Sequence, residues 1–213
     1  MLTLFDYLPS QNGWKIRQLL QHLRRPYETR LISIFEGEGK TDAYRCINPT
    51  GAVPAVVFDD GRALAESNAI LFHLAENTAY LPDDAFGRAK VLQWLSFEQN
   101  YVEMQIGTLR YWTLTGKLAQ RAPAMIQARR EASLRALRVL DAELAKQPFI
   151  TGDAYGIADI SLYAYASRAD EAELDLQIYP HFNQWMNRVQ AQDGHLALMY
   201  PYSIDPHASR ELG

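Results

Sequence analysis

A proline directly before a short apolar run is the first feature that suggests a binding function. In Ala52-Val53-Pro54-Ala55, Pro54 carries no N–H and cannot donate a hydrogen bond to a sheet. If the Val53–Pro54 bond is cis, the chain turns sharply there, and Val53 presents its N–H and C=O at an open strand edge. An extended peptide can pair with such an edge as an added strand. The alternative is an ordinary trans proline that opens a strand.

An acidic residue and a serine stand where a predicted strand gives way to a predicted helix. Glu66 and Ser67 come directly before the helical run Asn68-Ala69-Ile70. A serine at a helix start can cap the helix, and the free N–H groups there favour an anion. We therefore expect a ligand carboxylate at Ser67 and a ligand ammonium group at Glu66. The alternative is a plain capping pair without a ligand.

The segments that carry these residues alternate between strand and helix patterns. Strands over 2–5 and 27–34 enclose a helix marked by Ile16, Leu19 and Leu23, which recur at helical spacing. A short helix over 41–46 follows. Asp59-Asp60-Gly61 then joins two further strands in a tight hairpin, and a helix over 69–75 completes the order βαβ, helix, ββα. This order predicts one small α/β domain.

The pattern changes near residue 80, where Tyr80-Leu81-Pro82-Asp83-Asp84 is typical of a linker. No convincing strand follows it. Apolar residues at helical spacing predict four helices, over 91–109, from Pro123 to 144, over 157–169 and over 182–189. Strands followed only by helices indicate two packed domains. We place these domains at 1–79 and 86–200, with a C-terminal tail at 201–213.

Three segments of the first half, 48–55, 59–61 and 65–76, resemble the N-terminal domain of the glutathione transferase family. The similarity covers about residues 1–200. In the helical half it includes 151–153 and 157–160, where the family has a buried, capped helix start, although Gly156 stands where Ser or Thr is usual. The resemblance implies a thioredoxin-like α/β domain followed by an all-α domain, a homodimer, and glutathione as the co-substrate.

The resemblance also implies how glutathione is bound. In the family the proline that corresponds to Pro54 is cis, and the residue before it, here Val53, pairs with the cysteinyl backbone of glutathione. The Glu-Ser pair, here Glu66 and Ser67, binds the γ-glutamyl end. Lys40 is the expected partner of the glycine carboxylate, with a solvated lysine as the alternative.

A polar loop between the first strand and the first helix is the expected catalytic element. Pro9-Ser10-Gln11-Asn12-Gly13-Trp14-Lys15 resembles bacterial transferase loops that read Ser or Thr, any residue, Asn, Gly or Cys, an aromatic and Lys. There the hydroxyl and the amide approach the sulfur, so we nominate Ser10 and Asn12. Lowering a thiol pKa of about 8.5 by about 2 units takes roughly 2.7 kcal/mol, which hydrogen bonds and a helix N-terminus can supply. The alternative is that Asn12 only caps the helix.

Two other residues compete for the thiol role. Tyr7 lies near the end of the first strand, where other transferase classes place a thiol-binding tyrosine; its alternative is packing. Cys46 is the only cysteine, but related cysteine enzymes carry theirs in the first loop, so we expect a buried inert thiol. In the helical domain the family's second-substrate region corresponds to Tyr101, Met104, Tyr111 and Trp112, which core packing also explains.

Composition narrows the function classes. The formal net charge is −4, which does not favour nucleic acid or an anionic membrane as a partner. No apolar run reaches the ~18 residues of a membrane helix, and residues 1–7 do not read as a signal peptide. One cysteine forms no internal disulfide, and the five histidines lack ligand spacing, so we expect no metal and a cytoplasmic location.

The sequence therefore predicts a glutathione transferase whose thiolate attacks a hydrophobic electrophile. One alternative is glutathione-dependent reduction of disulfides or hydroperoxides without a protein cysteine. Another is a non-catalytic binding protein that keeps the fold.

Overall fold

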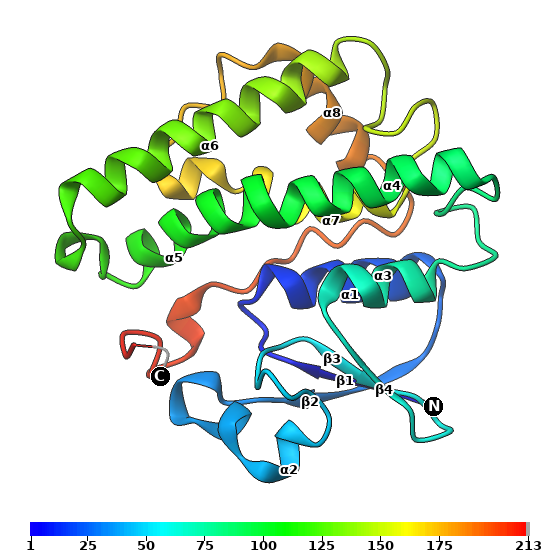
Figure 1. Cartoon of the computed structure of the whole chain (residues 1–213), viewed down its shortest axis with the longest axis vertical. Helices are drawn as coiled ribbons and strands as arrows, with labels where there is room; N and C mark the ends of the chain where they lie inside the picture. The colour runs from blue at the N-terminus through cyan, green and yellow to red at the C-terminus, as the bar shows by residue number, and fades with distance from the viewer. Residues whose placement is uncertain (212–213) are drawn as a thin grey trace. The chain divides into compact units, whose positions relative to one another are not determined.

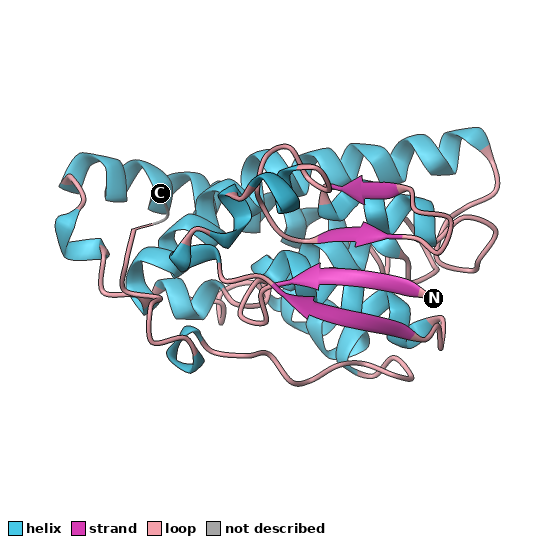
Figure 2. Cartoon of the chain, turned by 90° about the horizontal axis from the view of Figure 1, so that it is seen from below, coloured by secondary structure: helices cyan, strands magenta, loops and turns pink. Residues whose placement is uncertain are grey.

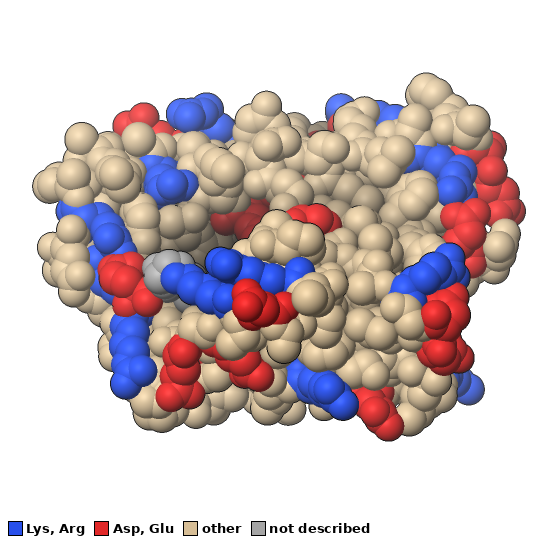
Figure 3. Space-filling view, turned by 60° about the horizontal axis from the view of Figure 1, so that its bottom comes forward, with Lys and Arg blue, Asp and Glu red and all other residues tan. Residues whose placement is uncertain are grey.

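The computed structural model describes residues 1–211. The chain divides into two compact units, Met1–Glu76 together with the described part of Asp193–Gly213, and Asn77–Gln192. Within residues 1–211, no helix is both long and apolar enough to span a bilayer. On the face shown in Figure 3, Lys and Arg side chains are interspersed with Asp and Glu.

The first unit is built on a four-stranded sheet in the order β2-β1-β3-β4 (Figure 2). Strand β1 (Leu2–Asp6) pairs in parallel with β2 (Tyr27–Leu31) and antiparallel with β3 (Ala55–Val57). Strand β4 (Ala63–Ala65) pairs antiparallel with β3 through the predicted hairpin, which Gly61 closes at a φ of 84°. Because β1 and β2 are parallel, a crossover must join them, and helix α1 (Gln11–His22) supplies it.

Alternate residues of β1 serve two different layers, as the pleat of a strand requires. Leu2 and Leu4 are buried. Helices α1 and α3 (Ser67–Leu74) contact each other and lie on one side of the sheet (Figure 1). Phe5 points the other way and joins a cluster with Tyr44 of the short helix α2 (Asp42–Arg45). Asp6 therefore falls on the α1 side of the sheet.

Two features of this unit differ from the expected boundaries. Strand β2 ends at Leu31 rather than Ile34, because Ile34–Glu36 forms the 3₁₀ turn η1, in which Ser33 O accepts from Glu36 N at 3.1 Å. The segment after Asp193 packs on α1: Trp14 Nε1 donates to Leu196 O at 3.1 Å, and Gln18 Oε1 accepts from Leu196 N at 2.7 Å. Beyond it, Tyr202–Ile204 forms the short helix η6.

The second unit contains the predicted helices. Helix α4 (Ala85–Phe97) continues through a π-helical stretch, η3 (Glu98–Gly107), into α5 (Thr108–Leu114), so one long helical segment covers the predicted 91–109 (Figure 1). Helix α6 (Pro123–Leu144) starts at the predicted proline, and α7 (Ile157–Ala166) and α8 (Pro180–Gln190) follow. Most of the apolar residues that defined these patterns are buried, such as Leu137, Leu140 and Val189, whereas Leu134 is half-buried.

Helix α7 begins at a buried polar cap. Asp159 Oδ2 accepts from Gly156 N at 3.1 Å, and its Oδ1 accepts from Ile150 N at 2.9 Å and Trp185 Nε1 at 2.8 Å. Gly156 has no side chain to return a cap bond, so only the Asp159 half of a capping box forms. A Cβ at Gly156 would lie 2.9 Å from Tyr80 O, which gives a steric reason for glycine here.

Candidate functional site

Three chain segments that the sequence nominated leave the sheet at the same end. In the register of the sheet, Phe5 pairs with Ala55, and Ala55 pairs with Ala65. The antiparallel pairing places the C-terminal end of β1, the N-terminal end of β3 and the C-terminal end of β4 together. One edge of the sheet therefore brings together three segments: the loop 7–10, the Val53–Pro54 turn and the Glu66–Ser67 junction.

Ser10 is the N-cap of α1. Its backbone is extended, with φ −68° and ψ 126°, and its Oγ accepts from Gly13 N at 3.4 Å. A hydroxyl can accept at one lone pair while its proton donates elsewhere. Ser10 can therefore cap the helix and still offer an O–H to an anion at the helix N-terminus.

Asn12 does not cap α1, so that alternative reading of Asn12 is wrong. Its Oδ1 accepts from Ser67 Oγ at 3.1 Å, across 55 residues of sequence. This hydrogen bond ties the first turn of α1 to the first turn of α3. Since the amide oxygen faces Ser67, the amide nitrogen of Asn12 is turned to other partners.

The Glu66–Ser67 junction differs in detail from a serine cap. Glu66 occupies the N-cap position with φ 67° and ψ 112°, a conformation rare for a residue with a side chain, and it makes no side-chain cap bond. Ser67 is the first helical residue and is buried. Its hydroxyl is directed to Asn12, while the side chain of the exposed Glu66 stands at the helix start.

The Val53–Pro54 bond is cis. Ala52 O, just before it, accepts from Tyr44 Oη at 2.7 Å and from Asn48 Nδ2 at 2.8 Å, so two side chains hold the approach to the turn. Within residues 1–211, the N–H and C=O of Val53 take no hydrogen bond. They form the open edge that an added peptide strand would need.

A buried ion pair, which the sequence did not reveal, supports the loop at 7–10. Arg17 donates from Nη2 to Leu8 O at 2.9 Å and to Ser10 O at 3.5 Å, and its Nε lies 3.4 Å from Asp6 Oδ2. Burial raises the pKa of Asp6, and the Arg17 charge opposes that rise. The guanidinium also lies over the Tyr200 ring, 5.4 Å from its centroid. Arg17 thus holds two carbonyls of the loop that carries Ser10.

Lys15 is a second buried cation near the same residues. It has no exposed surface, and its Nζ lies 3.5 Å from Ser67 Oγ. The loop motif contains this lysine, but the sequence analysis assigned it no role. Its position on α1, three residues after Asn12, puts both side chains on one helix face.

Tyr7 is packed among aromatic rings. Its side chain is 7% exposed, and its ring centroid lies 5.8 Å from that of Phe35 and 6.4 Å from that of Tyr202. Tyr7 also lines a cavity of about 360 Å³ within the first unit. Its walls combine apolar residues such as Ile32 and Ile204 with the polar side chains of Ser33, Glu36, Glu38, Asp205 and His207. Its thiol role stays a prediction.

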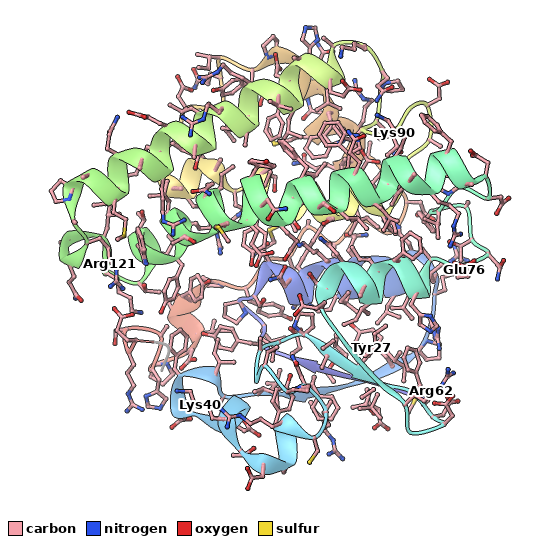
Figure 4. All side chains as sticks on the ribbon, viewed as in Figure 1. Tyr27, Lys40, Arg62, Glu76, Lys90 and Arg121 are labelled. Atoms are coloured by element: carbon pink, nitrogen blue, oxygen red, sulfur yellow. The ribbon has the colours of Figure 1, made fainter. Side chains whose placement is uncertain are left out.

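Lys40 and Cys46 lie in the segment between β2 and β3. Lys40 ends the short helix η2 (Glu38–Lys40) and is exposed (Figure 4), so its binding role stays a prediction. Cys46 is exposed at the C-terminal end of α2; the expectation of a buried thiol is wrong. Helix α2 packs through Tyr44, which is buried, and that leaves Cys46 on the open side.

The four residues proposed for the second substrate lie on the long helical segment of the second unit. Tyr101 and Met104 are 57% and 54% exposed on η3. Trp112 is buried, with the guanidinium groups of Arg121 and Arg129 within 5.2 and 5.3 Å of its ring centroid. Lys117 Nζ lies 4.4 Å from the Tyr111 ring centroid. Tyr101 also has a packing partner, since its ring centroid lies 5.1 Å from that of Phe97. Tyr101 and Met104 nevertheless keep more than half of their surface exposed; all four roles stay predictions.

No group of His, Cys, Asp and Glu among residues 1–211 is arranged to hold a metal ion. The polar groups that the sheet brings together are the helix-start side chains of Ser10 and Asn12, the start of α3 at Ser67 and the open backbone of Val53. Such a set suits a peptide-like ligand that carries an anion near α1.

Comparisons with known proteins show which family this chain resembles. Family models for the glutathione S-transferase N-terminal and C-terminal domains match residues 9–77 and 123–188. A glutathione S-transferase structure from Pseudomonas fluorescens Pf-5 is 37% identical, with a TM-score of 0.89 over 92% of this chain and 97% of that chain.

For two further similar proteins, a particular activity or a bound ligand is known. The disulfide-bond oxidoreductase YfcG of Escherichia coli (strain K12) is 28% identical over 90% of this chain and 91% of that protein. A glutathione transferase from Burkholderia graminis, with two glutathione molecules bound per subunit, is 27% identical, with a TM-score of 0.78 over 91% of this chain and 85% of that chain.

Proposed function

Because this chain belongs to the glutathione S-transferase family, we propose that it binds glutathione at the shared edge of the sheet and holds its sulfur as a thiolate between Ser10 and Asn12. The thiolate forms a bond to a carbon of a hydrophobic electrophile, the leaving group of the electrophile (halide, for an aryl halide) departs to solvent, and the product is a glutathione conjugate. The observation that carries the proposal is the Ser67–Asn12 hydrogen bond of 3.1 Å. It directs the amide nitrogen of Asn12 away from Ser67.

The rest of glutathione has a matching set of partners. The cysteinyl backbone pairs with the free N–H and C=O of Val53, and Glu66 and the α3 start at Ser67 take the γ-glutamyl ammonium and carboxylate. Lys40 is our candidate for the glycine carboxylate. All of these residues except Lys40 lie at the one edge that the sheet register defines.

Neutral donors suit the reaction. Hydrogen bonds to a charged group contribute about 1.5–3 kcal/mol each, so Ser10 and Asn12 together supply the roughly 2.7 kcal/mol that lowers a thiol pKa by about 2 units. The N-terminal end of α1 adds a favourable field for the anion. The free thiol is a poor nucleophile, so this ionisation is the central catalytic contribution.

Replacement of Asn12 by alanine tests the assignment. We expect Asn12→Ala to raise the pKa of bound glutathione by about 1–2 units and to lower turnover more than affinity. Ultraviolet absorbance of the thiolate, titrated against pH, gives the pKa, and calorimetry gives the affinity. Asn187→Ala, at an exposed position of α8, is the matched control. An unchanged pKa and rate in Asn12→Ala would transfer the thiol role to Tyr7.

Reduction of disulfides is the second candidate, favoured by the similarity to the oxidoreductase YfcG. Two glutathione thiols would reduce one disulfide to two thiols and leave as oxidised glutathione. In this reaction glutathione supplies both sulfur atoms. We do not expect the protein to add one, because its one cysteine, Cys46, lies outside the first loop. Parallel assays with an aryl halide and a small mixed disulfide separate the two reactions, and Cys46→Ser should leave both rates unchanged.

Two further parts of the proposal concern its setting. A thiol co-substrate and a single exposed cysteine suit the reducing cytoplasm. We also propose a homodimer, which light scattering would detect.

A third function, a non-catalytic scaffold, would be favoured if the protein failed to bind immobilised glutathione.

A further inference from the structure

Lys15 is fully buried beside residues that the proposed function uses. It lies on α1 with its Nζ 3.5 Å from Ser67 Oγ, and Ser67 Oγ lies 3.1 Å from Asn12 Oδ1. A lysine is rarely buried completely unless polar partners engage its ammonium group. The three side chains form a chain of hydrogen bonds from the lysine to the amide.

The chemistry of the three groups fixes the direction of this chain. An ammonium group can only donate, so Ser67 Oγ accepts from Lys15. The single proton of the Ser67 hydroxyl is then directed to Asn12 Oδ1, which can only accept. The positive charge of Lys15 also favours the oxygen end of the amide dipole on this side.

From this direction we propose that Lys15 is a positioning residue. It acts through Ser67 to hold the Asn12 amide in the orientation that presents its N–H groups to the glutathione sulfur. The inference rests on the proposed function, because it assumes that Asn12 contacts the thiolate. In the opposite orientation the amide oxygen would face the thiolate and oppose ionisation.

The test compares Lys15→Met with Lys15→Arg in the full-length protein. Methionine fills a similar volume without charge or donors, whereas arginine keeps both. We expect Lys15→Met to raise the pKa of bound glutathione by about one unit, which lowers the thiolate fraction about tenfold, and Lys15→Arg to restore part of it. Lys146→Met, at a side chain that is 68% exposed, is the matched control and should match wild type.

A double-mutant cycle shows whether Lys15 acts through Asn12. In an Asn12→Ala background, Lys15→Met should change the thiol pKa little further, since the amide that it orients is gone. Additive effects of the two substitutions on the pKa would overturn the proposal. The proposal would also be overturned if the wild-type protein lowers the thiol pKa of bound glutathione and Lys15→Met leaves that pKa unchanged.

Binding of S-methylglutathione, which has no ionisable thiol, excludes a simpler role. If Lys15→Met weakens glutathione and S-methylglutathione equally and leaves the pKa unchanged, the lysine serves the ligand carboxylate and the proposal is wrong. If wild type itself does not lower the thiol pKa, the proposed function fails instead. If Lys15→Met does not fold, variants of Ser67 provide the test. Ser67→Ala removes the hydroxyl and should raise the thiol pKa of bound glutathione, whereas Ser67→Thr keeps the hydroxyl and should restore the pKa. Any other result would refute the proposal.

Discussion

Asp159, at the start of α7, gives a sharp prediction about pH and stability. Its carboxyl group has no exposed surface and accepts from Ile150 N, Trp185 Nε1 and Gly156 N. Burial raises its pKa from 3.8 to about 6, although the three hydrogen bonds oppose that rise. The folded chain therefore keeps this proton to a higher pH than the unfolded chain.

The sign and size of the effect follow from proton linkage. Between the two pKa values the folded state binds more protons, so the contribution of Asp159 to stability is complete below pH 3.8 and is lost as pH rises through about 6. A difference of about 2 units corresponds to about 3 kcal/mol. Asparagine at this position does not titrate.

Urea unfolding of wild type and Asp159→Asn from pH 4 to pH 7 measures this difference. We expect wild type to lose about 2.4 kcal/mol of unfolding free energy relative to the variant over that range, because the rest of the loss falls below pH 4. Other titrating groups, Asp6 among them, are common to both proteins and cancel. Asp153→Asn, at an exposed position nearby, should keep the wild-type pH profile. A difference between Asp159→Asn and wild type that is constant from pH 4 to 7 would refute the reasoning.

Two further predictions concern the loop that carries Ser10. In Gly13→Ala the new Cβ would meet Asp6 Oδ1, so α1 or the carboxylate must shift. We expect the free energy of unfolding to fall by about 1–3 kcal/mol, measured by thermal unfolding, and turnover to be slower. An unchanged Tm would contradict this. Arg17→Met leaves Asp6 buried without its partner, which we expect to cost about 3–5 kcal/mol at neutral pH. Because burial already raises the pKa of Asp6, that cost should shrink in acid, and a loss that is equal at both pH values would argue against an ionised pair.

Local patterns predicted the elements well. The hairpin at Asp59-Asp60-Gly61 and the proline at the start of α6 are confirmed, because turn chemistry and helix starts depend on a few adjacent residues. The junction at Glu66 shows the limit. The sequence favoured Ser67 as a cap, but the strand-to-helix turn holds Glu66 at a positive φ and makes Ser67 the first helical residue.

Exposure was harder to foresee than secondary structure. Cys46 reads as a buried thiol from its apolar neighbour Ile47, yet α2 packs through Tyr44 and leaves the cysteine outside. Conversely, no pattern in the sequence marked Arg17 or Lys15 as buried, yet both are. A charged side chain is buried only when a partner from another element reaches it, and one sequence does not display such partners.

The sequence by itself determined the order of strands and helices, the polar loop before α1 and the candidate residues around Pro54 and Ser67. These are properties of neighbours along the chain, such as turn preference, helical spacing and capping. The tertiary structure decided that β1, β3 and β4 end at one edge, and that Ser67, Asn12 and Lys15 are joined there. Contacts between residues more than fifty positions apart depend on sheet register and burial, which local patterns do not encode.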